Sequence, residues 1–104
     1  MKINILDASL EKFIKSLEKS TIAKVLRIID LLEKFGHNLG LPHSKKVCGQ
    51  LYELRIRRAQ EVRIFYIFRK SKIFLLHGFI KKSQRVPGRE IRLALKKAHR
   101  FDNV

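Results

Sequence analysis

The spacing of hydrophobic residues changes from a helical period to a strand period near the middle of the chain. Before Gly36 the apolar residues recur at intervals of three and four, which is typical of one face of an α-helix. This pattern predicts a helix after Asp7, which can cap it, and a second helix capped by Ser20 or Thr21 and ended by Gly36. The two apolar faces are Leu10, Phe13, Ile14 and Leu17, followed by Ile22, Val25, Ile29, Leu32 and Phe35.

The remaining segments are strand-like or irregular. Residues 2–6 alternate and predict a short edge strand, whereas residues 36–46 contain two glycines and one proline and predict a loop. After this loop the runs LYELRIRR, EVRIFYIFR and KIFLLHGFIKK have a period of two. Their short connectors, Arg58-Ala59-Gln60 and Lys70-Ser71, require antiparallel hairpins. The segment from Pro87 to Phe101 returns to helical spacing, with Pro87 in the first turn.

These elements predict one α+β domain that spans residues 1–104. We expect a small twisted antiparallel sheet, with the N-terminal helical hairpin on one face and a C-terminal helix. The two turns place Arg55 opposite Arg63, and Arg63 opposite Gly78. Alternation then predicts a core face made of Tyr52, Leu54, Ile56, Val62, Ile64, Tyr66, Phe68, Ile73, Leu75, His77 and Phe79. The opposite face receives Glu53, Arg55, Arg57, Arg63, Arg69 and Gly78, with Phe65, Ile67, Phe74 and Leu76 at one end.

Charge adds information about partners. The chain carries 24 Lys and Arg against 9 Asp and Glu, a net charge of +15, of which +13 lies in residues 37–104. A net charge of about 2–8 is enough to keep a small domain soluble. The larger excess therefore favours an anionic partner: nucleic acid first, an acidic protein second and a membrane surface third.

Other chemistry is sparse. The apolar run from Ile73 to Ile80 is eight residues long and too short to span a membrane. No signal peptide is visible, and the single cysteine, Cys48, cannot form an intrachain disulfide, so we expect a cytoplasmic protein. His37 and His43 lack further ligands at a metal-binding spacing, and we expect no metal or cofactor.

Arg55 facing Arg63 is a local conflict, because like charges opposite each other destabilise a strand pair. Such conflicts concentrate at functional sites. Lys82 is expected to join this face where the third strand ends, and Gly78 would leave room for a ligand. The alternative is a plain solvated face on which Arg55 pairs with Glu53 or Glu61.

The segments LYELR (51–55), VRIFY (62–66) and LLHGFIKKSQRVPGREIRLA (75–94) resemble the RelE/ParE toxin superfamily, in particular its HigB-like, phage-related branch. The resemblance implies a RelE-like fold and a type II toxin, a ribosome-dependent endoribonuclease that cuts translated mRNA. It also implies a cognate antitoxin, which is acidic or a helix-turn-helix protein. RNA supplies its own nucleophile, the 2′-OH, so the protein needs mainly preorganised positive charge.

Residue by residue, the resemblance assigns catalytic roles to Arg55, Arg63 and Lys82. It also matches Lys81 to the basic pair after the last strand, and we expect Lys81, Arg57 and Arg85 to bind substrate. The chain departs from the family pattern in three places. Tyr52-Glu53-Leu54 replaces lysines that some relatives carry, Val86 replaces a helix-capping Thr, and no C-terminal catalytic Tyr is present, with His99 as a possible substitute.

Three other functions remain open. The first is a ParE-like inhibitor of DNA gyrase on the same fold, and the second is a basic nucleic-acid-binding module without catalysis. The third is an inactive relative that only binds an antitoxin.

Overall fold

The computed structural model describes residues 1–101. It has an α+β fold, which confirms the expected class. The elements in chain order are β1 (Lys2–Ile5), α1 (Ala8–Lys15), α2 (Lys19–Phe35), the 3-10 turn η1 (Gly36–Asn38), β2 (Ser44–Cys48), β3 (Leu51–Arg57), β4 (Glu61–Arg69), β5 (Lys72–Ile80), α3 (Gly88–Ala98) and the 3-10 turn η2 (His99–Phe101). Within residues 1–101, no helix has the length and apolar character needed to cross a bilayer.

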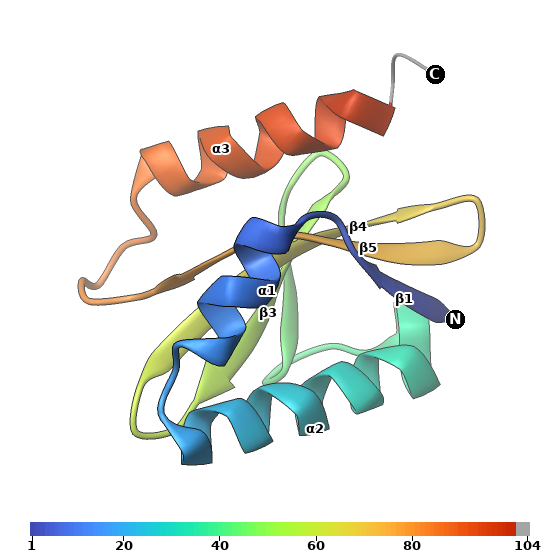
Figure 1. Ribbon diagram of the computed structural model, residues 1–104. Helices are drawn as coiled ribbons and strands as arrows, with labels where there is room; N and C mark the ends of the chain where they lie inside the picture. The colour runs from blue at the N-terminus through green and yellow to red at the C-terminus, as the bar shows by residue number, and fades with distance from the viewer. Residues whose placement is uncertain (102–104) are drawn as a thin grey trace.

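The five strands form one sheet in the order β1-β5-β4-β3-β2. The sheet is the middle layer of the molecule, with α3 on one side and α2 on the other (Figure 1). Strands β3, β4 and β5 form the two predicted antiparallel hairpins. Strand β2 pairs antiparallel with β3, and β1 pairs in parallel with β5. The sheet is therefore mixed rather than purely antiparallel.

The helix ends follow local chemistry. The Asp7 carboxylate accepts a hydrogen bond from the Leu10 N–H at 3.1 Å and caps α1, as predicted. The predicted caps Ser20 and Thr21 are wrong, since α2 begins at Lys19 and Glu18 occupies the capping position. There the Glu18 N–H donates to the side-chain oxygen of Gln60 in the β3–β4 turn, at 2.8 Å. This contact satisfies a free N–H at the helix end and ties α2 to the sheet.

Strand β2 begins inside the segment predicted as a loop, residues 36–46, and continues two residues beyond it. Ser44 pairs with Leu54 and Lys46 with Tyr52, so β2 extends the sheet beyond β3. The hydroxyl groups of Ser44 and Tyr66 form a buried hydrogen bond, which fixes β2 against β4 across β3. Burial raises the pKa of the Tyr66 phenol, while the Ser44 hydroxyl partly opposes this shift.

The register of the first hairpin is as predicted, with Arg55 opposite Arg63. The predicted register of the second hairpin is wrong near Arg63, which pairs with Phe79 and not with Gly78. A β-bulge causes the shift: Phe65 pairs with His77 and Tyr66 with Leu75, so the residue between them on β5 has no partner. An extra residue on one strand reverses the alternation beyond it.

The reversal moves three residues to new faces. Gly78 lies on the helical-hairpin face, where an added Cβ would stand 2.8 Å from Cε2 of Phe13. Its missing side chain therefore makes room for α1 and not for a ligand beside Arg63. His77 and Phe79 move to the opposite face, and the expectation that they belong to the helical-hairpin core is wrong.

Both faces of the sheet are covered by apolar packing. The larger core lies between the sheet and helices α1 and α2. The second lies under α3 and contains Leu51, Phe65, Ile67, Leu76, Phe79, Ala94 and Ala98. On this side His77 Nε2 lies 2.9 Å from Oε2 of Glu90, which links β5 to the first turn of α3. The face of the sheet that carries Arg55 and Arg63 is thus partly covered by α3.

Candidate functional site

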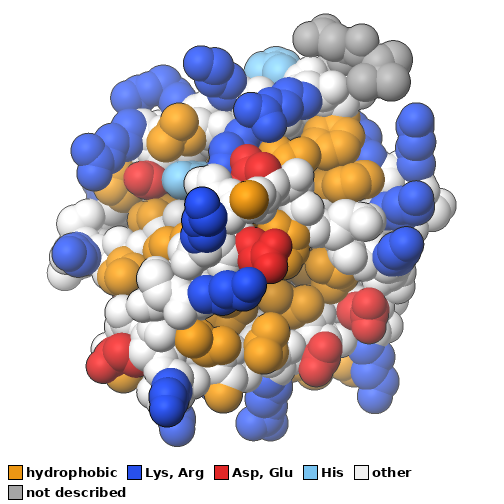
Figure 2. All heavy atoms as spheres, viewed as in Figure 1, with side chains coloured by type: hydrophobic (Ala, Val, Ile, Leu, Met, Phe, Trp, Pro, Cys, Tyr) orange, Lys and Arg blue, Asp and Glu red, His pale blue; other side chains and the backbone are white. Residues whose placement is uncertain are grey.

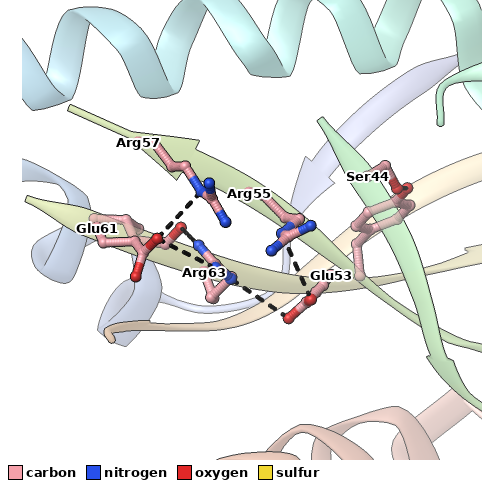
Figure 3. Close-up of polar contacts among 8 residues, drawn as sticks. Ser44, Glu53, Arg55, Arg57, Glu61 and Arg63 are labelled. Atoms are coloured by element: carbon pink, nitrogen blue, oxygen red, sulfur yellow. Dashed lines mark hydrogen bonds and ion pairs between the residues drawn. The ribbon is translucent and has the colours of Figure 1, made fainter. Parts of the chain in front are cut away.

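Five charged side chains on β3 and β4 form a chain of alternating sign, which we call the Arg–Glu network (Figure 3). Arg55 Nε lies 3.9 Å from Oε1 of Glu53, and Arg63 Nε lies 3.6 Å from Oε2 of the same carboxylate. Arg63 Nη2 lies 3.5 Å from Oε1 of Glu61, which is also 3.2 Å from Nε of Arg57. The two carboxylates therefore separate three guanidinium groups that would otherwise repel one another.

Arg63 is the buried centre of the network, with a side chain only 1% exposed. It donates a hydrogen bond from Nη1 to the carbonyl of Val62, at 3.4 Å. Within the described chain, its Nε and Nη2 have no hydrogen-bond partner, and neither do Nε of Arg55 and Oε2 of Glu53. Leaving buried polar groups without hydrogen bonds costs free energy. These atoms lie within ion-pair distance of one another, so charge attraction holds the network together more than hydrogen bonds do.

The same geometry sets the electrostatics of Arg63. Burial lowers the pKa of its guanidinium, the carboxylates of Glu61 and Glu53 raise it, and the nearby Arg55 and Arg57 lower it. The net shift is downward, although an arginine remains protonated throughout the usual pH range. The network therefore keeps a net charge of +1, from three cations and two anions.

Exposure increases from the centre of the network towards its edge. The side chain of Arg55 is 20% exposed and that of Arg57 is 67% exposed. Among the carboxylates, Glu61 is 35% exposed and Glu53 only 8%. A ligand from solvent thus meets Arg55, Arg57 and Glu61 first, with Arg63 and Glu53 beneath them.

The predicted lysine pair follows β5 directly. The backbone N–H of Lys81 donates to the carbonyl of Glu61 at 2.7 Å, so the chain at this point still runs beside the network. Alternation from Phe79, the partner of Arg63, assigns Lys81 to the network face, so the expectation that Lys82 joins this face is wrong. Lys82 lies in an open hollow of about 460 Å³ that also contains Phe13 and Glu90.

Of the predicted site residues, the structure brings Arg55, Arg57 and Arg63 into direct ionic contact with shared carboxylates. Lys82 and Arg85 instead occupy the exposed segment between β5 and α3. Sequence reasoning considered Glu61 only as a partner for Arg55, whereas it bridges Arg57 and Arg63. The signal was present in the predicted hairpin turn, which sets Arg57 opposite Glu61.

Basic side chains are spread around most of the visible outline of the molecule, with few acidic groups between them (Figure 2). Within residues 1–101, no three His, Cys, Asp or Glu side chains come together in a way that could hold a metal ion. The described surface can therefore attract an anionic polymer, and the network is where several cations converge.

Two of the comparisons with known proteins find a similarity. Residues 12–99 match the family model described as phage-derived protein Gp49-like (DUF891). Among solved structures, the chain is similar to a chain in the crystal structure of the archaeal RelE–RelB complex from Pyrococcus horikoshii OT3. The TM-score is 0.52 and the identity is 22%, over 82% of this chain and 97% of that chain. No curated protein matches the sequence.

The fold is therefore that of a small RelE-like domain, since the similarity covers nearly all of the archaeal chain. Because the family model matches most of the sequence, the chain belongs to the Gp49-like phage-derived family.

Proposed function

We propose that the chain is the toxin of a type II toxin–antitoxin pair, of the HigB-like branch, and that it cleaves translated mRNA on the ribosome. The observation that carries the proposal is the cross-strand Arg55–Arg63 pair, held by two carboxylates on a RelE-like sheet. A pair of like charges is unfavourable for folding alone, and an anionic substrate would compensate it.

The network suggests how charge would be used. Attack of a ribose 2′-oxygen on the adjacent phosphorus builds negative charge on the non-bridging oxygens, and fixed cations lower the barrier by stabilising it. The exposed Arg57 and the partly exposed Arg55 are the guanidinium groups that can hold those oxygens. Arg63 would act from beneath, as a buried positive charge that also keeps Glu53 and Glu61 in place.

The proton balance follows from exposure. The 2′-OH loses its proton as the new P–O bond forms, and Glu61 is the more exposed carboxylate able to accept it. The P–O5′ bond breaks, and the leaving 5′-oxygen takes a proton from a lysine ammonium, for which Lys82 and Lys81 are the candidates. The products are a 2′,3′-cyclic phosphate and a 5′-OH, and the scheme requires no metal. Arg85 would bind the RNA backbone.

A cognate antitoxin is part of the proposal. The similar archaeal chain was solved in a RelE–RelB complex, and a net charge of +15 would favour an acidic partner. A helix-turn-helix antitoxin is the alternative that the HigB-like resemblance implies. Such a pair would act in the cytoplasm, where mRNA is translated.

Induction of the chain in cells, followed by primer-extension mapping of several mRNAs, tests the proposal. We expect growth arrest, new 5′ ends inside translated reading frames, and relief of both by the protein encoded next to this gene. RNA mapped after blocking translation initiation serves as the control, because a ribosome-dependent enzyme leaves untranslated RNA intact.

The outcome also separates the remaining functions. Growth arrest with DNA damage that depends on gyrase, and with no new RNA ends, would indicate a ParE-like gyrase inhibitor. Salt-sensitive RNA binding without cleavage would indicate a non-catalytic module. Binding of the neighbouring protein, with neither growth arrest nor RNA binding, would indicate an inactive relative.

A further inference from the structure

A second basic hollow lies at the end of the sheet opposite the Arg–Glu network. Its walls come from η1, from the β2–β3 turn with Gly49 and Gln50, and from the β4–β5 turn. It has a volume of about 410 Å³, within the range of roughly 300–1,000 Å³ typical of small-molecule sites. We call this hollow the turn basin. Phe68, in its wall, is five residues from Arg63 along β4, a separation of about 17 Å in a strand.

The walls of the turn basin combine flat rings with positive charge. The His37 and Phe68 rings stack with centroids 3.8 Å apart, and Tyr52 meets Phe68 edge to face at 5.3 Å. His37 is exposed and lines the basin, so its ring is accessible to a ligand there. Lys46 and Lys70 add ammonium groups, and among the described residues no acidic side chain lines the basin.

The backbone at the rim is unusual. Lys70 and Ser71 both have positive φ, 52° and 61°, although neither is glycine. A two-residue hairpin turn of this kind normally contains Asn-Gly or Asp-Gly, which reach positive φ at little cost. Residues held in this region are strained, and such strain concentrates at functional sites. Here the strained residue Lys70 places an ammonium at the basin.

We infer that the turn basin binds one nucleotide of a single-stranded RNA, with the base stacked on His37 and the phosphate held by Lys46 and Lys70. Single-stranded RNA is recognised by stacking of splayed bases on aromatic or histidine rings, combined with charge along the backbone. The inference deepens the proposed function, since it gives the same RNA a second contact, and it rests on that function for choosing RNA over DNA.

The alternative ligand is an acidic protein segment, which would also be attracted by the two lysines. It would have no need for the stacked rings, and carboxylates alone do not fill a hollow of about 410 Å³. A base with its phosphate uses both properties of the wall, so RNA is the better match.

Adenosine 5′-monophosphate is the first probe, followed by amide chemical shifts of the intact chain. We expect the largest shifts at His37, Gly49 and Lys70, and saturation with a single affinity. Shifts confined to the Arg–Glu network, or no shifts, would overturn the inference. Titration of an acidic peptide gives the comparison, and binding of that peptide alone would also overturn it.

A labelled six-nucleotide 2′-O-methyl RNA, which cannot be cleaved by 2′-oxygen attack, then measures affinity in variants. We expect Lys46→Gln combined with Lys70→Gln to weaken binding about tenfold and to make it less dependent on salt. Lys12→Gln combined with Lys19→Gln removes the same charge from exposed positions on α1 and α2, and should weaken binding by less than about threefold. Equal losses in both pairs would mean that only net charge matters, and the inference would fail.

The stacking contact is tested by His37→Ala, for which we expect about tenfold weaker binding, with His43→Ala as the matched control. The Arg55→Ala protein separates this site from the proposed activity. If it still binds the nucleotide at the basin while the parent chain cleaves no RNA, the proposed function fails and the inference stands. If the parent chain cleaves RNA but its basin binds no nucleotide, the proposed function stands and the inference fails.

Discussion

The Lys97 ammonium on α3 donates to the backbone carbonyl of Leu76, the β5 residue that the bulge leaves without a cross-strand partner, at 3.1 Å. The same Nζ lies 3.1 Å from Oδ2 of Asp7, the cap of α1. One side chain from the C-terminal helix therefore satisfies an irregular point of the sheet and contacts the start of the first helix. The bulge, α1 and α3 are coupled through it.

Replacement of Lys97 by methionine should destabilise the fold by about 1–3 kcal/mol, because a part-buried carbonyl and a carboxylate lose their shared donor. Urea denaturation gives the free energy of unfolding. Lys96→Met is the matched control, since Lys96 is exposed, and its effect should stay within about 0.5 kcal/mol. Equal effects of the two substitutions would show that the Lys97 contacts add nothing.

Asp7 predicts a pH dependence of stability. Burial raises the pKa of this carboxyl, but the hydrogen bond from Leu10 and the charges of Lys97 and Arg100 outweigh burial, so the pKa lies below its ordinary value of 3.8. A group with a depressed pKa stabilises the fold above its unfolded pKa, and this contribution is lost as the pH falls through the folded pKa.

The Asp7→Ala protein should therefore be less stable than the parent by about 0.5–2 kcal/mol near neutral pH, the usual cost of losing an N-cap. The difference in unfolding free energy should shrink once the pH falls below 3.8, because the parent then loses the charge. Denaturation curves for both proteins across this range make the comparison. A difference that stays constant with pH would rule out the ionic contribution.

Glu53 holds two arginines and is itself buried, with Arg63 at 1% exposure beside it. Glu53→Ala leaves a buried guanidinium with Glu61 as its remaining partner, and removing one member of a buried pair typically costs about 3–5 kcal/mol. Glu11→Ala breaks only the exposed pair with Lys15, and exposed pairs contribute about 0–1 kcal/mol. Thermal or urea denaturation should therefore show a larger loss of stability for Glu53→Ala than for Glu11→Ala.

The helices, the hairpin turns and the Arg55–Arg63 pairing could be predicted from the sequence, because each depends on local spacing. The apolar period defines the helices, and the short connectors fix the first register. Strand β2 could not be predicted in this way. It is five residues long, contains Lys45 and Lys46, and owes its conformation to the partner strand β3.

The bulge in β5 and its effect on the facing of the side chains could not be predicted from the sequence either. Residues 73–80 are a continuous strand-like run, and nothing in their order marks Leu76 as the residue without a partner. Because alternation reverses there, the roles expected for Gly78 and His77 were wrong. The burial of Arg63 also depends on long-range packing, so its place opposite Arg55 was predicted correctly while its depth in the site was not.

Gly78 gives a prediction in which the sign of the effect changes. In the parent protein Gly78→Ala sets a Cβ 2.8 Å from the Phe13 ring, and such overpacking costs about 1–3 kcal/mol. In a Phe13→Ala background only Leu10 Cδ1, at 3.1 Å, stays close to the added Cβ, and it is the end of a side chain that can move. Alanine in a strand should then be better than glycine by about 0.5–1 kcal/mol. A double-mutant cycle of unfolding free energies measures this coupling. Additive effects would mean that α1 does not constrain the glycine.

Arg55 is the residue that best separates activity from folding. It stands opposite Arg63 but is partly exposed, so Arg55→Ala should preserve the fold and lower RNA cleavage by about 100-fold or more, as expected for loss of a fixed charge at the reacting phosphate. Arg55→Lys keeps the charge and loses the planar fork, and should recover only part of the activity. Arg58→Ala, in the adjacent turn, removes one exposed positive charge and serves as the control. Single-turnover cleavage, with circular dichroism to check folding, distinguishes a reacting-site role from a general charge effect, since the latter would make Arg55 and Arg58 equivalent.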